Sequence, residues 1–229
     1  EPEGVETEDG QRVLDHPAFR QDSCSSLEIL AYGAAPMPLP VIRRAIAMFP
    51  STVGFVNAFG QTETTATVTM LLPDDHRLEG SALEMEKKLQ RLASIGRPLS
   101  DVEVRIVDPA GAEVASGEVG EIVHRSPHVM LGYFHDDERT AAAFEGGWFH
   151  SGDLGTIDDE GYITVVDRKK DMIKTGGENV ASREVEEALY RLAGVSEVAV
   201  IGLPHPRWIE AVTAVIVQKP DAGLTEAQV

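Results

Sequence analysis

A strand–helix–strand pattern near the start of the chain constrains its fold more than any other feature. Residues 27–33 are mostly apolar and end at a glycine, residues 41–49 place apolar side chains on one helical face, and residues 52–58 are again apolar. The connections are short, and a helix that links two neighbouring strands makes them parallel. The pattern therefore predicts a βαβ unit with two buried strands in a parallel sheet.

The sequence pattern changes its period further along the chain. Apolar and polar side chains alternate in residues 102–107 and 119–123, with turn-forming residues between them. A further hairpin is predicted at residues 154–166, so we expect residues 97–166 to be mainly antiparallel. Five charged residues at 167–171 mark a candidate boundary between modules. Beyond it the sequence predicts a helix that Ser182 caps and two strands, at residues 195–201 and 211–217.

Composition argues against several classes of function. The chain has 20 basic and 38 acidic side chains, and this net charge of −18 repels a nucleic-acid backbone. Its longest apolar runs are far shorter than a membrane span, and no secretory signal opens it. One cysteine, Cys24, excludes an internal disulfide framework. We therefore expect a cytoplasmic protein with no nucleic-acid partner and no transmembrane segment.

Thr62 and Glu63 are the first candidates for chemistry. They follow the second predicted strand, in a loop at the carboxyl edge where α/β folds place ligands. A hydroxyl can donate a hydrogen bond to phosphate, and a carboxylate can hold Mg²⁺. The alternative is a polar loop whose threonine caps a helix.

Two later segments are the remaining candidates. The carboxylate of Asp153, which follows a glycine, can accept hydrogen bonds from both hydroxyls of a ribose, although Ser–Gly–Asp is also an ordinary turn sequence. Basic side chains beside a glycine loop suit phosphate recognition, and a solvated surface is the alternative. This basic segment contains Arg168, Lys169, Lys170, Lys174, Gly176 and Gly177.

Taken together, the motifs resemble those of the adenylate-forming superfamily, which includes acyl-CoA synthetases, acyl-adenylating domains and luciferases. The matches run in order along nearly the whole chain. They are the glycine–alanine–proline segment beside adenine (residues 32–36), the YGxTE motif (57–63), the GE(L/I)…GY segment (120–133), the TGDL motif with serine for threonine (148–154), and the hinge with the CoA-tunnel loop (167–180).

The resemblance implies roles for individual residues. Thr62 would bind the α-phosphate and Glu63 the Mg²⁺, as the catalytic pair, while Asp153 would hold the ribose and Arg168 would reach the ribose or phosphate. Phe59 replaces a tyrosine that is common in the family and keeps the ring that packs on adenine. The nucleotide-binding positions would also include Gly33, Ala34, Ala35, Asn57 and Gly60.

The resemblance also assigns the basic segment. Lys170 matches the hinge about which the small domain rotates. The CoA tunnel would be lined by Lys174, Gly176, Gly177 and Glu178, with glycine where a Cβ would crowd the path of the thiol.

The implied enzyme is an AMP-forming acyl-CoA synthetase, an acid–thiol ligase that uses ATP, Mg²⁺ and coenzyme A. A carboxylic acid attacks the α-phosphorus of MgATP to give an acyl-adenylate and pyrophosphate, and the CoA thiol then displaces AMP. The amino-acid sequences of the motifs are most similar to those of fatty-acyl and medium-chain synthetases. This resemblance implies a fatty acid as substrate. The alternatives are an acyl-AMP ligase that loads a carrier protein and a non-catalytic nucleotide-binding module.

Two departures from the family pattern predict a fragment. The chain contains no glycine-rich loop that ends in Pro-Lys-Gly, and it stops before the place of the adenylating lysine. We expect residues 1–168 to be the C-terminal part of the large domain and residues 169–229 the start of the small lid domain. The expected fold is α/β: part of a parallel sheet, an antiparallel β-barrel-like region and a truncated α+β lid. By itself the chain should bind nucleotide weakly without turnover, and an exposed sheet edge would favour self-association, as in a homodimer.

Overall fold

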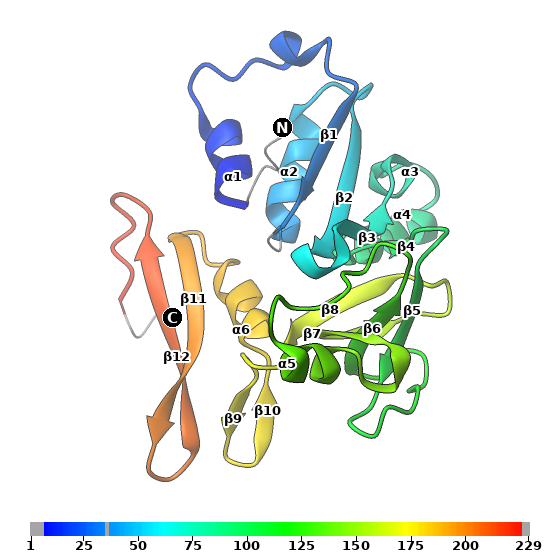
Figure 1. Cartoon of the computed structure of the whole chain (residues 1–229). Coiled ribbons are helices and arrows are strands. Elements are labelled where there is room, and N and C mark those ends of the chain that lie inside the picture. Colours follow the sequence, from blue (N-terminus) through cyan, green and yellow to red (C-terminus); the bar gives the residue numbers. More distant parts are fainter. Residues whose placement is uncertain (1–6, 35–36, 226–229) are drawn as a thin grey trace. The chain divides into compact units, whose positions relative to one another are not determined.

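The computed structural model describes residues 7–34 and 37–225, and within them the strands form three four-stranded sheets (Figure 1). The chain divides into two compact units. One comprises residues 1–151 and 156–165, and the other comprises residues 152–155 and 166–229. No helix among the described residues is long and apolar enough to cross a membrane.

The first sheet contains the predicted βαβ unit. Its strands, in spatial order, are β1 (Ile29–Gly33), β2 (Gly54–Gln61), β3 (Ala66–Leu71) and β4 (Arg97–Pro98). Strands β1 and β2 are parallel and are joined through α2 (Leu39–Met48), which confirms that part of the prediction. Strand β3 is antiparallel to both β2 and β4, so the sheet is mixed. The predicted parallel pair is therefore present, and the sheet becomes antiparallel beyond β2.

The core of this region lies between α2, β1 and β2. Helix α2 buries Ile42 and Ala45, which pack with Phe49 and Phe55 as the apolar spacing predicts. Helix α1 (Thr7–Asp15) and the short helix η1 (Gln21–Cys24) precede β1. Strand β1 is less buried than expected, because it lies at the edge of the sheet and only one of its five residues is buried.

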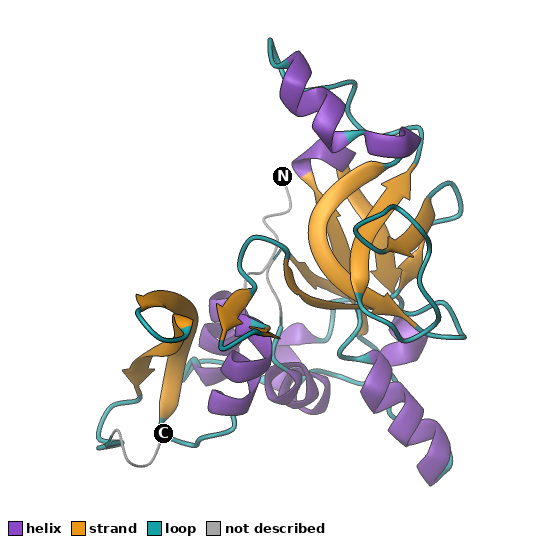
Figure 2. Cartoon of the chain, turned by 90° about the horizontal axis from the view of Figure 1, so that it is seen from below, coloured by secondary structure: helices purple, strands orange, loops and turns teal. Residues whose placement is uncertain are grey.

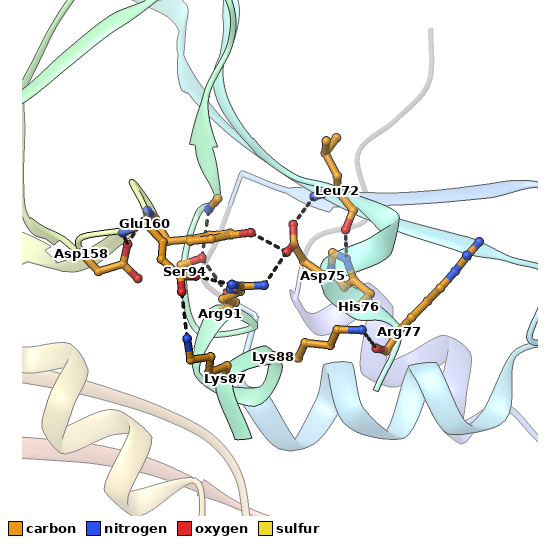
Figure 3. Close-up of polar contacts among 12 residues, drawn as sticks. Leu72, Asp75, His76, Arg77, Lys87, Lys88, Arg91, Ser94, Asp158 and Glu160 are labelled. Carbon is orange, nitrogen blue, oxygen red and sulfur yellow. Dashed lines mark hydrogen bonds and ion pairs between the residues drawn. The ribbon is translucent and has the colours of Figure 1, made fainter. Parts of the chain in front are cut away.

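A polar cluster joins two short helices to the turn between β7 (Phe149–Ile157) and β8 (Ile163–Arg168). Helix α3 (Pro73–His76) contributes Asp75, and α4 (Ala82–Arg91) ends at Arg91. The hydroxyl of Tyr162 donates to Asp75 at 2.6 Å, and Arg91 pairs with both Asp75 and Glu160. Figure 3 shows these ion pairs, together with that between Lys87 and Glu160. The cluster fixes the turn of the hairpin to α3 and α4.

The second sheet has the strand order β5 (Glu103–Val107), β6 (Gly120–Arg125), β7 and β8. Strands β5 and β6 pair antiparallel, and Ile106, Ile122 and Ile163 form its fully buried centre. Helix α5 (Asp137–Ala143) and the short helix η3 (Glu145–Gly147) precede β7. The antiparallel prediction for β5 and β6 is confirmed. The strand order is linear, with β5 and β8 at the two edges of the sheet, so the barrel-like closure that we expected is not confirmed. Figure 2 shows the chain coloured by secondary structure, with its strands in orange.

The third sheet belongs to the second unit. Its order is β10 (Glu178–Val180), β9 (Ile173–Thr175), β12 (Ile209–Gln218) and β11 (Val195–His205). Helix α6 (Ser182–Leu189) buries Leu189 against Ile173 and Val200. The helix and both long strands lie where the sequence predicted them. Ser182 is not the cap that we expected, because it is the first residue of α6 and its own hydroxyl donates to Asp167.

Candidate functional site

Thr62 and Glu63 lie immediately beyond the carboxyl end of β2, in the short helix η2 (Thr62–Thr64). The side chain of Thr62 is exposed and that of Glu63 is half-buried. The residues before them are not in the loop that we expected, because β2 continues through Phe59, Gly60 and Gln61. These three residues pair with β3, with a shift of register after Phe59. Thr62 and Glu63 therefore lie at the predicted carboxyl edge of the sheet, after a strand β2 that is longer than predicted.

Gly60 has a structural reason to be glycine. A Cβ at this position would lie 1.4 Å from the carbonyl oxygen of Ala66, so no side chain fits. Gly33 is similar, because its Cβ would lie 2.2 Å from the carbonyl oxygen of Ala58 on the neighbouring strand. Both glycines are therefore required by close approach of the backbone, whatever they contribute to nucleotide binding.

The turn after Glu63 has a strained backbone that neighbouring groups hold in place. Thr65 has a φ of +59° and Ala66 a φ of +128°, which are uncommon for residues with a side chain. The fully buried hydroxyl of Thr64 accepts a hydrogen bond from the backbone nitrogen of Gln61 at 3.0 Å. The hydroxyl of Thr65 donates to the carbonyl oxygen of His128 at 2.7 Å. These bonds fix the backbone next to Thr62 and Glu63, the pair that we predicted to be catalytic.

The carboxylate of Glu63 has a partner that the sequence did not reveal. The hydroxyl of Tyr133 donates to Oε1 of Glu63 at 3.0 Å, and the backbone nitrogen of Met130 donates to the carbonyl oxygen of Glu63 at 2.7 Å. Burial raises the pKa of Tyr133, and the hydrogen bond to Glu63 raises it further. Tyr133 is the last residue of the GE(L/I)…GY segment (120–133). Its place in that motif is the one feature of the sequence that marks it as a candidate site residue.

Two further contacts connect separate motifs. The amide of Gln61 donates to the carbonyl oxygen of Ser151 at 2.9 Å, so the segment before Thr62 adjoins Ser151 although the two residues are 90 apart in sequence. One residue earlier, Nδ1 of His150 lies 3.0 Å from a carboxylate oxygen of the buried Glu121. Sequence reasoning assigned no role to Gln61, His150 or Glu121.

Asp153 and Arg168 come together in the second unit. Asp153 is buried, and Nε of the exposed Arg168 lies 3.8 Å from its Oδ1. The backbone nitrogen of Lys169 donates to the carbonyl oxygen of Gly152 at 2.8 Å, which holds the strands side by side at this point. The structure thus brings the predicted ribose-binding carboxylate next to the predicted arginine.

The predicted CoA-tunnel loop is a tight turn between β9 and β10. Thr175 pairs with Glu178, and the two residues between them, Gly176 and Gly177, have φ values of +58° and +91°. Two-residue hairpins commonly need positive φ at both positions, which favours glycine. A Cβ at Gly177 would meet nothing within 4 Å. The turn therefore requires glycine for its conformation. Lys174 and Glu178, which lie in the two strands of this hairpin, are exposed, and so is Lys170, which precedes β9.

The remaining predicted nucleotide-binding positions fall in the first sheet. Ala34 follows β1 with a φ of +64°, and Phe59 is half-buried in β2. The side-chain amide of Asn57 donates to the carbonyl oxygen of Ser94 at 3.3 Å. Ala35 lies outside the described residues.

The donor chemistry fits the predicted Mg²⁺. No group of three or more His, Cys, Asp or Glu side chains gathers anywhere in residues 7–34 and 37–225, so the described part of the chain has no all-protein cage. Mg²⁺ is usually held by one or two carboxylates together with water and substrate phosphates. The Glu63 carboxylate, with Thr62 as the residue before it in η2, supplies the hard oxygen donor that such a site needs.

Comparisons with known proteins agree with the motifs. The family model described as AMP-binding enzyme matches residues 10–134, and that of the AMP-binding enzyme C-terminal domain matches residues 184–229. A feruloyl-CoA synthase from Amycolatopsis sp is 41% identical over 90% of this chain and 39% of its own length. The medium/long-chain-fatty-acid–CoA ligase FadD8 of Mycobacterium tuberculosis is 39% identical over 93% of this chain and 35% of its own length.

A solved structure is similar over the same extent. The amide bond synthetase McbA from Marinactinospora thermotolerans superposes with a TM-score of 0.84 and 35% identity, covering 96% of this chain and 42% of that one. The chain thus spans about two fifths of the length of the relatives that it matches. The family-model matches and these identities show that the chain belongs to the AMP-binding enzyme family, within the adenylate-forming superfamily that its motifs resemble.

Proposed function

We propose that this chain is part of an AMP-forming acyl-CoA synthetase. One observation carries the proposal: beyond the carboxyl end of β2, the carboxylate of Glu63 accepts a hydrogen bond from Tyr133, and the residue before it, Thr62, is exposed. A carboxylate and a hydroxyl at this edge suit a nucleoside triphosphate with its cation. The relatives of this chain include proteins named as a CoA synthase and a CoA ligase.

Each site residue has a role in this proposal. The hydroxyl of Thr62 donates to the α-phosphate and Glu63 binds Mg²⁺, which when bound offsets the negative charge on the phosphate oxygens. The carboxylate of Asp153 accepts hydrogen bonds from the ribose hydroxyls, and Arg168 contacts the ribose or phosphate. The nucleotide also contacts Gly33, Ala34, Ala35, Asn57, Phe59 and Gly60.

The proposed reaction has two balanced steps. An oxygen of the substrate carboxylate forms a bond to the α-phosphorus of ATP while the bond to pyrophosphate breaks. The thiolate of CoA then bonds to the acyl carbon, and AMP leaves with the electron pair. We assign residues 1–168 to the large domain and residues 169–229 to the small lid domain. The lid turns at Lys170 between the steps, and Lys174, Gly176, Gly177 and Glu178 line the path of CoA.

A fatty acid is the acyl substrate that we propose. The amino-acid sequences of the motifs support this substrate. The similarity to FadD8, whose name specifies medium- and long-chain fatty acids, supports it as well. The feruloyl-CoA synthase is similarly close and is named for an aromatic acid. A panel of carboxylic acids must therefore include both chemical types.

The complete polypeptide that contains this chain provides the test. Carboxylate-dependent exchange of pyrophosphate into ATP should proceed with a fatty acid of the panel. Glu63→Gln should reduce the exchange by about 100-fold or more, because a charge-stabilising group is lost. Glu145→Gln, which alters an exposed carboxylate in η3, is the matched control and should leave the rate unchanged. Binding of MgATP without exchange for any acid would instead identify a non-catalytic nucleotide-binding module.

The acceptor needs a separate experiment. The acyl-adenylate formed by the complete enzyme should be discharged by free CoA, with release of AMP. Discharge by a holo-carrier protein, but not by CoA, would identify the alternative ligase. Discharge by an amine alone would identify amide synthesis, the activity for which the structurally similar McbA is named.

A further inference from the structure

The loop that contains Tyr133 holds Glu63 by both its side chain and its backbone. The hydroxyl of Tyr133 donates to Oε1 of Glu63 at 3.0 Å, across 70 residues of sequence. In the same loop, the backbone nitrogen of Met130 donates to the carbonyl oxygen of Glu63 at 2.7 Å. Two anchors three residues apart thus fix the position of the glutamate and the direction of its carboxylate.

Tyr133 is itself held by the start of α5. The guanidinium of Arg139 lies 3.7 Å from the centre of the Tyr133 ring, and the hydroxyl of Thr140 accepts a hydrogen bond from the Tyr133 backbone nitrogen at 2.9 Å. Gly132 allows this approach, because a Cβ there would lie 2.7 Å from the methyl group of Thr140. A continuous set of contacts therefore leads from α5 through Tyr133 to Glu63.

Apolar burial does not explain this loop. The two apolar side chains beside Tyr133 point into solvent, since Leu131 is fully exposed and Phe134 is 89% exposed. Tyr133 is only half-buried, and it belongs to none of the apolar cores that the described residues form. Its hydroxyl therefore contributes mainly to the orientation of Glu63 and little to the stability of the fold.

A carboxylate with one oxygen fixed presents the other in a defined direction. We propose that Tyr133 is a positioning residue that holds Oε1 of Glu63, so that the second oxygen faces the cation of the bound nucleotide, and that Arg139 holds the phenol ring in place. This inference rests on the proposed function, which assigns the cation to Glu63. Groups that orient a metal-binding carboxylate typically change metal affinity by about 10- to 100-fold.

The test measures how nucleotide binding depends on Mg²⁺, without any turnover. Calorimetric titration of the complete polypeptide with ATP, at a series of Mg²⁺ concentrations and with no carboxylic acid present, gives the Mg²⁺ concentration for half-maximal affinity. Tyr133→Phe should raise this concentration about 10-fold and should scarcely change the melting temperature. Arg139→Gln should raise it by less. Tyr190→Phe removes a hydroxyl in the second unit and should leave it unchanged.

Glu63→Gln separates this inference from the proposed function. If Glu63→Gln abolishes the Mg²⁺ dependence but Tyr133→Phe does not shift it, the positioning role is wrong and the proposed Mg²⁺ site stands. If Glu63→Gln has no effect, both the metal assignment and the positioning role are wrong. A Tyr133→Phe protein that melts at a much lower temperature with unchanged Mg²⁺ dependence would show a purely structural role and would overturn the inference.

Discussion

The carboxylate of Asp167 accepts hydrogen bonds from both the backbone nitrogen and the hydroxyl of Ser182, at 2.5 Å and 2.9 Å. Both residues are buried. The bonds provide an acceptor for the first backbone nitrogen of α6, which has no partner within the helix. The other oxygen of Asp167 accepts from the backbone nitrogen of Arg168 at 2.7 Å. One carboxylate thus joins the end of β8 to α6 and fixes the backbone of the predicted phosphate-binding arginine.

Replacement of Asp167 should therefore destabilise the second unit. Asp167→Ala leaves a buried backbone nitrogen and hydroxyl without an acceptor, which should lower the free energy of unfolding by about 1–3 kcal/mol. Asp167→Asn keeps an acceptor and should cost less. Urea denaturation measures both effects. Asp171→Ala, an exposed change in the same charged run, is the control. An equal loss for Asp167→Ala and Asp171→Ala would contradict this account.

Substitutions of Gly177 can distinguish two reasons for glycine at this position: the positive φ of the turn, and a CoA tunnel that excludes a side chain. Gly177→Ala should destabilise the hairpin by about 1–2 kcal/mol, since positive φ is unfavourable for an L-residue with a Cβ. Gly177→Asn should cost less, because asparagine tolerates this conformation. In the complete enzyme, the KM for CoA distinguishes the two explanations. If Gly177→Asn keeps the stability but raises the KM for CoA strongly, a tunnel that excludes a side chain is supported in addition to the turn.

The contact between Tyr162 and Asp75 should stabilise the hairpin of β7 and β8. Tyr162→Phe removes the hydroxyl that donates to Asp75, a buried carboxylate, and should lower the free energy of unfolding by about 1–3 kcal/mol. Asp75→Asn and the double variant complete a cycle that isolates the pair. Thermal or urea unfolding provides the values. Additive losses in the double variant would show that the two groups do not interact.

The same tyrosine predicts a loss of stability in alkaline solution. Burial and the bond to Asp75 raise the pKa of Tyr162 to about 12, above the ordinary value of 10.0. Because the folded protein holds this proton more tightly, the stabilisation is complete below pH 10 and is lost as the pH rises from 10 to 12. Tyr162→Phe should flatten this part of the stability profile. A profile that is unchanged in Tyr162→Phe would contradict the prediction.

His124 predicts the corresponding loss in acid. The ring is fully buried, neither nitrogen has a hydrogen-bond partner within the described residues, and burial lowers the pKa of His124 to about 4. The neighbouring His128 contributes the smaller part of this lowering of the pKa of His124. The unfolded chain therefore binds this proton first, and stability falls as the pH drops from 6.5 towards 4.

The size of this effect follows from the shift. Each pKa unit corresponds to about 1.4 kcal/mol, so His124 accounts for a loss on the order of 3 kcal/mol across the window. His124→Phe, beside the ring of Phe149, should remove most of this dependence, whereas the exposed His16→Gln should not. Melting temperatures between pH 4 and pH 7 decide the matter. An equally steep profile in His124→Phe would show that other groups cause the acid loss.

Local patterns predicted several elements of this fold. The apolar spacing of Ile42 and Ala45 gave α2, and the alternation around Ile106 and Ile122 gave β5 and β6. The same patterns did not predict the position of each strand in its sheet or the direction of its neighbours. Strand β1 lies at an edge with little burial, and β3 turns the first sheet from parallel to mixed, because strand direction depends on pairing and not on periodicity.

The sequence by itself determined α2, β5, β6, α6 and the two long strands of the third sheet, the place of Thr62 and Glu63 beyond β2, and the family to which the motifs point. Only the tertiary structure decided that Tyr133 holds Glu63, that Gln61 reaches Ser151 and that Asp167 caps α6. The physical reason is the range of the interactions. Helices and strands follow from side chains within a few residues of one another, whereas a hydrogen bond across 70 or 90 residues forms only after the intervening chain has packed.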